Sequence, residues 1–162
     1  MASASREYHP DDEHGVVELS LRARAPVFAS MEDVLGVELN RRLHGGDWRT
    51  YQAFSVRATL NAAGMKSWVA ESDGRVVGFV AAIVRDRDRK IGEIDMLAVD
   101  PPHQGLGTGT RLTQLATDWL RRQGMRVAVV GTGGDPGHAP ARRTYEKADY
   151  SVMPMARYFK AL

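Results

Sequence analysis

"IGEIDMLAVDPPHQGLGTGTRLTQLATDWL" occupies residues 91–120, and its two halves have different periodicities. Residues 91–99 form an apolar run that precedes two prolines, which predicts a β-strand. Residues 110–123 repeat apolar side chains at spacings of three and four, which predicts an amphipathic helix. Three glycines, at positions 105, 107 and 109, lie between the two patterns. A strand, a glycine loop and a helix start together predict an anion site, because the helix start presents unpaired amides.

The spacing of the glycines distinguishes between three known types of anion-binding loop. A Walker loop ends in Gly-Lys-Ser or Gly-Lys-Thr, whereas this loop ends in Gly109-Thr110-Arg111. A dinucleotide fingerprint spaces its glycines as G-x-G-x-x-G, whereas here they follow G-x-G-x-G. A third pattern, Gln/Arg-x-x-Gly-x-Gly/Ala, fits Gln104, Gly107 and Gly109. Taken alone, the loop is also compatible with a glycine-rich turn that holds no ligand.

With this third pattern the sequence resembles the GNAT superfamily of acetyl-CoA-dependent N-acetyltransferases. A second segment, "APARRTYEKADY" at residues 139–150, is similar to the family's Ala-x-x-x-Tyr-Glu-Lys-x-Gly-Phe segment. The resemblance covers about residues 16–159 and implies transfer of an acetyl group from acetyl-CoA to a primary amine, by direct attack in a ternary complex. The alternatives are a non-catalytic acyl-CoA-binding or sensing domain on the same fold, and a nucleotide-binding oxidoreductase.

The whole chain predicts an α/β (α+β) domain with a GNAT-like, mixed, mostly antiparallel sheet of six to seven strands flanked by about four helices. Strands are expected at 16–23, 66–72, 75–84, 91–99, 125–133 and 150–159, and helices at 27–43, 48–64, 110–123 and 139–148. Asp73-Gly74 predicts a tight hairpin turn and Asp47 predicts a helix N-cap. Residues 1–14 are expected to form a flexible lead-in, and residues 15–162 a single acetyltransferase domain.

Composition excludes several other classes of protein. The 162 residues carry 22 basic and 20 acidic side chains, a balance that argues against a dedicated nucleic-acid binder. There is no cysteine, and the five histidines lack the paired spacing of a zinc site, so no metal is expected. No apolar stretch has the length of a membrane span, and the first residues lack an apolar signal region. We therefore expect a cytoplasmic enzyme without a membrane partner.

The resemblance implies a set of residues that bind acetyl-CoA as cosubstrate. The loop amides would hold its pyrophosphate, and these belong to Gln104, Gly105, Leu106, Gly107, Thr108 and Gly109. The pantetheine arm would pair like an added strand with the main chain of Leu97, Ala98 and Val99. Family members often carry Asn where this chain has His138. That histidine could cap the helix, bond the cofactor or titrate near neutral pH.

The resemblance also implies an acid and a base. Tyr145 matches the family tyrosine that faces the cofactor sulfur and protonates the leaving thiolate, although packing on the sheet is the alternative role. Glu93 matches the glutamate that several members use as base, often through a water. Asp95 lies two residues further along the strand and points to the same face, so Asp95 or water alone remains an alternative base. Glu93 could instead pair with an arginine of the 85–89 segment.

The acceptor is expected to be a small-molecule or peptide amine. An aminoglycoside-like amine, a polyamine, an amino acid, a protein lysine and an N-terminus all remain open. The helices over residues 27–63 should form one wall of the acceptor site. The last predicted strand allows either a homodimer that exchanges terminal elements or, because of Pro154, a simple bulge or edge.

Overall fold

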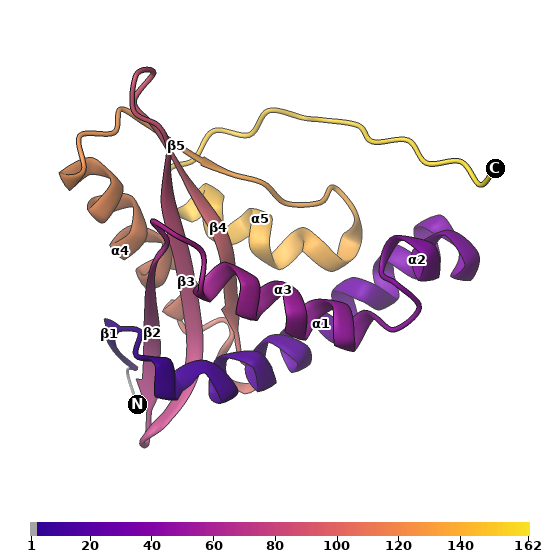
Figure 1. Cartoon of the computed structure of the whole chain (residues 1–162), viewed down its shortest axis with the longest axis horizontal. Coiled ribbons are helices and arrows are strands. Elements are labelled where there is room, and N and C mark those ends of the chain that lie inside the picture. Colours follow the sequence, from indigo (N-terminus) through magenta and orange to yellow (C-terminus); the bar gives the residue numbers. More distant parts are fainter. Residues whose placement is uncertain (1–2) are drawn as a thin grey trace.

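A single five-stranded sheet organises the chain in the computed structural model, which describes residues 3–162 (Figure 1). The strands are β1 (Ala4–Glu7), β2 (Lys66–Ser72), β3 (Arg75–Asp86), β4 (Ile91–Val99) and β5 (Val127–Val130). Their order in the sheet follows their order in the chain. The pairings from β1 to β4 are antiparallel, and only β4 and β5 run parallel. The predicted mixed, mostly antiparallel sheet is confirmed.

The helices lie on the two faces of this sheet. They are α1 (Glu13–Leu35), α2 (Val37–Leu43), α3 (Trp48–Leu60), α4 (Thr108–Arg122) and α5 (Ala139–Lys147). Three 3-10 turns, η1 (Pro10–Asp12), η2 (Pro101–His103) and η3 (Pro136–His138), connect them to the rest of the chain. None of the helices in the described part of the chain is long and apolar enough to cross a membrane.

Local sequence explains where several of these elements begin and end. Asp73 and Gly74 both have positive φ, at 50° and 71°, which gives the tight β2–β3 turn that their sequence predicted. Asp47 caps α3 by accepting hydrogen bonds from the amides of Arg49 and Thr50 at 3.1 and 3.4 Å. The helix predicted over 27–43 is divided at Gly36, whose φ is 79°.

Two apolar layers hold the sheet between the helices (Figure 1). On one face, α4 packs its apolar stripe against the sheet through Leu112, Ala116 and Leu120. On the other face, α1 and α3 pack against Val69, Phe79 and Ala98, and contribute Val16, Val17, Leu19, Val56 and Leu60. The sheet is therefore covered on both sides, as in other layered α/β domains.

The strand expected at 16–23 is wrong, because these residues belong to α1. Val16, Leu19 and Ser20 are all buried and are three to four residues apart, which is a helical spacing. The short alternation of apolar residues that suggested a strand was thus part of a helical stripe. Pro26, which was expected to open a helix, lies inside α1 instead.

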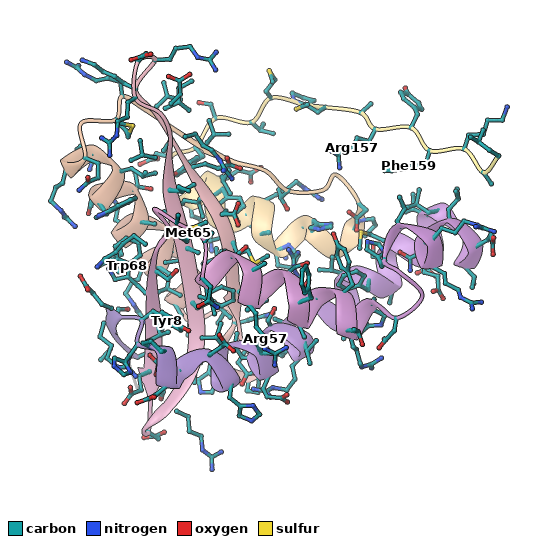
Figure 2. The ribbon with its side chains drawn as sticks, viewed as in Figure 1. Tyr8, Arg57, Met65, Trp68, Arg157 and Phe159 are labelled. Atoms are coloured by element: carbon teal, nitrogen blue, oxygen red, sulfur yellow. The ribbon has the colours of Figure 1, made fainter. Side chains whose placement is uncertain are left out.

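The strand expected at 150–159 is also wrong, since no strand follows α5 in the described chain. Residues 151–162 form an exposed tail that leaves the sheet, and Arg157 and Phe159 lie on it (Figure 2). Pro154 has no amide hydrogen to donate to a strand ladder. Without these two strands, and with β1, which was not expected, the sheet has five strands, and the expected count of six to seven is wrong.

The first residues carry regular structure where a flexible lead-in was expected. Residues 4–7 form β1, which pairs with β2 from Ala4–Glu71 to Glu7–Trp68. Arg6 donates to both Asp12 and Glu71, with nitrogen–oxygen distances of 2.7 and 2.9 Å. The segment before α1 thus extends the sheet at its outer edge.

Leu112→Ala is expected to lower the free energy of unfolding by about 2–5 kcal/mol, because Leu112 is fully buried between α4 and the sheet and its loss leaves a cavity. Denaturant unfolding measures this loss. Leu115→Ala removes a partly buried leucine of the same helix and should cost clearly less. Equal losses in the two variants would contradict the packing described for α4.

Candidate active site

β4 has a free main-chain edge over its last residues. Its pairing with β5 runs from Ile91–Val127 to Ile94–Val130 and stops there. Residues 95–99 continue beside β3, but no described strand pairs with their other side. A register shift between Ala81 and Ala82 also leaves Asp95 without a partner in β3. The chain after β5 therefore diverges from β4 and leaves main-chain groups available for an added extended ligand.

A cavity of about 130 Å³ lies beside this edge. Four parts of the chain line it: α1, the end of β4, the glycine loop and the start of α5. The lining residues are Ala23, Arg24, Pro26, Val27, Leu97, Ala98, Val99, Gln104, Gly109, Gly137, His138, Pro140, Ala141 and Thr144. Six residues predicted to bind the cofactor are therefore brought to one cavity.

The glycine loop presents the start of α4 without a side-chain cap. Gly107 is the N-cap and has a left-handed φ of 82°. The first helical hydrogen bond runs from the amide of Arg111 to the carbonyl of Gly107 at 3.0 Å. The amides of residues 108–110 are thus left at the helix start, where the helix dipole is positive. This arrangement fits a phosphate or pyrophosphate group.

The side chains of the loop mostly hold the loop itself. Gln104 donates from Nε2 to the carbonyl of Val99 at 2.9 Å, which ties the loop to the end of β4. Thr108 is buried, and its Oγ1 lies 3.2 Å from the Oγ of Ser3. Arg111 also donates to Ser3, at 2.9 Å. Main-chain amides rather than these side chains are therefore the groups that could hold an anion, while the side chain of Leu106 is exposed.

Tyr145 lies on α5, one helical turn after Ala141 and directly after Thr144; these two neighbours line the cavity, whereas Tyr145 itself is not among the lining residues. Only 9% of its surface is exposed. Burial raises the pKa of Tyr145 to about 12, while the nearby cation of Arg24 acts in the opposite direction. Tyr145 is therefore fully protonated at neutral pH, which is the form that a proton donor needs.

Glu93 lies outside the cavity. Its Oε2 is 2.5 Å from Nε of Arg85, and the same arginine contacts Asp95 at 3.0 Å. Asp95 also accepts a hydrogen bond from Thr59 at 2.9 Å. Glu93 and Leu97 are four residues apart along β4, about 13 Å. Glu93 thus forms the ion pair that the sequence analysis gave as its alternative role. Because Glu93 lies outside the cavity, any contact with a ligand there would need bridging water.

His138 lines the cavity at the start of α5 and is paired through Nδ1 with Asp135. Asp135 in turn accepts from the Oγ of Ser30 at 2.6 Å, which fixes this loop to α1. Burial opposes ionisation of Asp135, but the hydrogen bonds from Ser30 and His138 outweigh it and lower the pKa of this carboxyl. His138 precedes Tyr145 by seven residues, about 10 Å along the helix. His138 and Tyr145 therefore lie near opposite ends of α5.

Arg24 is the cavity residue that the sequence analysis missed. It comes from α1, is half-buried, and carries the one permanent charge among the residues that line the cavity. Burial lowers the pKa of its guanidinium, and the neighbouring Tyr145 partly offsets this effect. A helical interpretation of 16–28 would have found it, because Val17, Ser20, Arg24 and Phe28 recur at spacings of three and four.

Several solved structures with a similar fold are named acetyltransferases. One is an acetyltransferase of the GNAT family from Desulfovibrio desulfuricans, with a TM-score of 0.66, 22% identity, and coverage of 94% of this chain and 87% of that one. Another is the PaiA N-acetyltransferase of Thermoplasma acidophilum in complex with coenzyme A, with a TM-score of 0.65, 11% identity, and coverage of 91% and 89%. The fold is therefore that of the acetyltransferases.

The family itself is established from the sequence. The model of the acetyltransferase (GNAT) family matches residues 35–150, so the chain belongs to the GNAT family. A mycothiol acetyltransferase of Saccharomonospora viridis is 34% identical over 122 residues, which cover 66% of this chain and 39% of that protein. The chain thus spans well under half the length of this curated relative.

Proposed function

We propose that this chain is an N-acetyltransferase that transfers the acetyl group of acetyl-CoA to a primary amine by direct attack. The observation that carries the proposal is the cavity together with three features at or directly beside it. These features are the unpaired edge of β4, the uncapped start of α4 and the buried phenol on α5. An anion site next to a strand edge and a proton donor matches the three parts of an acyl-CoA: pyrophosphate, pantetheine amides and sulfur.

The binding of acetyl-CoA is assigned mainly to main-chain groups. In this proposal, the amides of residues 104–109 hold the pyrophosphate at the positive end of α4. The main chain of residues 97–99 pairs with the amides of the pantetheine arm along the free edge of β4. His138 donates to the same arm from its free ring nitrogen, because Asp135 already occupies Nδ1. The substrate supplies an activated acyl group in the form of a thioester.

Tyr145 is assigned to proton donation at the sulfur end. The amine nitrogen forms a bond to the acetyl carbon, the carbon–sulfur bond breaks, and the sulfur takes the phenolic proton of Tyr145. Acid–base help of this kind contributes about 10²- to 10⁴-fold to rate. The phenol regains a proton from solvent, and the amine loses its protons to a base or to water. No change of oxidation state occurs.

Glu93 is assigned to proton uptake from the amine through bridging water, and Glu93→Gln tests this. We expect kcat to fall about tenfold at pH 7, and the defect to shrink at higher pH as more of the amine loses its proton unaided. Rates of thiol release measured from pH 6.5 to 9.5 test this expectation. Glu71→Gln is the matched control, since Glu71 is another strand glutamate paired with an arginine, at 2.9 Å. If both variants behave alike at every pH, water alone accepts the proton.

The acceptor is assigned to the class of small-molecule or peptide amines. A similar protein is named a mycothiol acetyltransferase, and the solved relatives act as acetyltransferases by name, which supports an acceptor with a nitrogen nucleophile. We also propose a cytoplasmic location, a single domain that includes β1 and η1 together with residues 15–162, and a homodimer as the assembly to test by light scattering.

Amine-dependent thiol release tests the proposed activity. Acetyl-CoA and the protein are mixed with a panel of primary amines, and free coenzyme A is measured with a thiol reagent. We expect release above background with at least one amine and with none of the matched tertiary amines. Tight binding of acetyl-CoA without release in any sample would instead support a sensing domain, and affinity for a nicotinamide cofactor without affinity for coenzyme A would support an oxidoreductase.

A further inference from the structure

Arg24 has no ion-pair partner that would explain its position in the described residues. Its side chain enters the cavity from α1, and no aspartate or glutamate is among the residues that line this cavity. No ion pair joins Arg24 to a carboxylate in the described residues, whereas the neighbouring Arg22 is bound to Asp100 at 2.8 Å. A guanidinium taken out of water without a partner costs free energy. A half-buried cation that faces a cavity is thus expected to have a functional counter-charge.

The group that could supply this negative charge is the phenol of Tyr145 on α5. Ser30 of α1 accepts a hydrogen bond from the amide of Gly137 at 2.9 Å, so the two segments are joined there. Arg24 precedes Ser30 by six residues, about 9 Å of helix, and Tyr145 follows Gly137 by eight, about 12 Å. Arg24 and Thr144, the residue directly before Tyr145, line the same cavity, which brings the guanidinium and the phenol to neighbouring parts of α1 and α5.

Apart from Arg24, the cavity beside Tyr145 has no permanent cation in its lining. On the α4 side, its ring lies 6.1 Å from the ring of Tyr150, whose hydroxyl is bonded to Thr117. On α5 itself, the other titratable group at the cavity is His138, two turns away and paired with Asp135. The end of β4 offers only Leu97, Ala98 and Val99. Arg24 is thus the one permanent charge among the residues that line the cavity, and Tyr145 lies directly behind Thr144 of the same lining.

We propose that Arg24 is a positioning residue for acyl transfer, whose guanidinium balances the negative charge that Tyr145 acquires when it protonates the departing sulfur. The inference rests on the proposed function. The proton moves from the Tyr145 oxygen to the sulfur as the carbon–sulfur bond breaks, and the phenolate remains beside Arg24 until water returns a proton. The burial that disfavours each charge alone is compensated when the two charges are formed together.

Four variants measure this coupling: Arg24→Met, Arg24→Lys, Tyr145→Phe and the double variant Arg24→Met/Tyr145→Phe. Arg24→Met is expected to lower kcat about 10- to 100-fold, and Arg24→Lys to keep most of the rate because the charge remains. Once Tyr145 is phenylalanine, adding Arg24→Met should change kcat by less than about twofold, because coupled residues are not additive. Arg57→Met is the matched control, since Arg57 lies on α3 (Figure 2) and pairs with Glu13.

A second readout does not depend on turnover. The tyrosinate absorbance of each protein, minus that of its Tyr145→Phe counterpart, reports ionisation of Tyr145. We expect this signal to appear at higher pH in Arg24→Met than in the wild type, because the cation that favours the phenolate is gone. If turnover is absent but the absorbance shift is present, the proposed function fails while the pairing of Arg24 with Tyr145 stands.

Three results would overturn the inference. In the first, the affinity for coenzyme A drops in Arg24→Met while kcat is kept, which would make Arg24 a ligand of the phosphates. In the second, Arg24→Met lowers kcat equally with and without the Tyr145 hydroxyl, which would indicate a structural role. In the third, the tyrosinate signal is identical in the wild type and Arg24→Met, which would show that the two groups do not interact.

Discussion

Tyr145→Phe is expected to lower kcat by at least about 100-fold, while the affinity for coenzyme A stays within about twofold. Phenylalanine keeps the ring that packs in a site where Tyr145 is only 9% exposed, so the helix and the cavity are preserved. The substitution removes only the hydroxyl, and therefore the proton that the departing sulfur requires. Stopped assays of thiol release give kcat, and isothermal titration calorimetry gives the affinity.

Tyr150→Phe is the matched control for this experiment. Tyr150 is a neighbouring tyrosine whose hydroxyl is already engaged, 2.7 Å from the Oγ1 of Thr117 on α4. Its loss should cost about 0.5–1.5 kcal/mol of stability and leave kcat unchanged. A Tyr145→Phe protein with a kcat within threefold of the wild type would remove the phenol from the mechanism.

The pH dependence of kcat carries the same expectation. Because burial raises the pKa of Tyr145 to about 12, the phenol keeps its proton throughout the working range of the enzyme. The rate should therefore not fall on the alkaline side below about pH 10, where an ordinary tyrosine begins to ionise. A decline centred well below that pH, and absent in Tyr145→Phe, would contradict the assigned burial of the phenol.

Gly107→Val is the second large expected effect, with a rise of about 100-fold or more in the dissociation constant for coenzyme A. Gly107 has a φ of 82°, which a β-branched residue does not adopt without strain. Valine would therefore force the loop to turn its amides away from the position where α4 begins. The phosphates would then lose hydrogen bonds that involve a charged partner, each of which is worth about 1.5–3 kcal/mol.

Gly74→Val separates the loss of binding from the loss of stability. Gly74 has a similar φ of 71° in the β2–β3 turn, and no atom lies within 4 Å of the position of an added Cβ. Both substitutions should lower the free energy of unfolding by a similar amount, about 1–2 kcal/mol. Only Gly107→Val should weaken coenzyme A. Equal weakening in both variants would mean that the glycine loop is not the anion site.

Local sequence was sufficient to predict the part of the chain that forms the loop and its flanks. The strand over 91–99 and the helix that follows are long and strongly periodic, so their type could be assigned without tertiary information. The positive φ of Gly107 also follows from sequence, because glycine is the residue that tolerates it. Tyr145 was found by resemblance to a family motif, and the structure adds its burial beside the cavity.

The remaining features depend on contacts that are distant in sequence. Residues 16–23 alternate over too few positions to separate a strand from one side of a helix, so the error hid Arg24, which lies on the same helical stripe. The sequence allowed Glu93 to pair with an arginine of the 85–89 segment but did not single out Arg85, because β3 and β4 must first be aligned. The same holds for the joint between Ser30 and Asp135, which connects residues 105 positions apart.

Transfer of a labelled acetyl group tests the central claim most directly. The protein is incubated with acetyl-CoA carrying a ¹³C-labelled acetyl group and with the amine that gives the fastest thiol release, and the products are followed by mass spectrometry. We predict that the label appears in an amide of that amine in a one-to-one ratio with free coenzyme A, and that Tyr145→Phe and Gly107→Val both suppress it. Coenzyme A release without a labelled amide, or no labelled amide with any primary amine despite tight binding, would contradict the account.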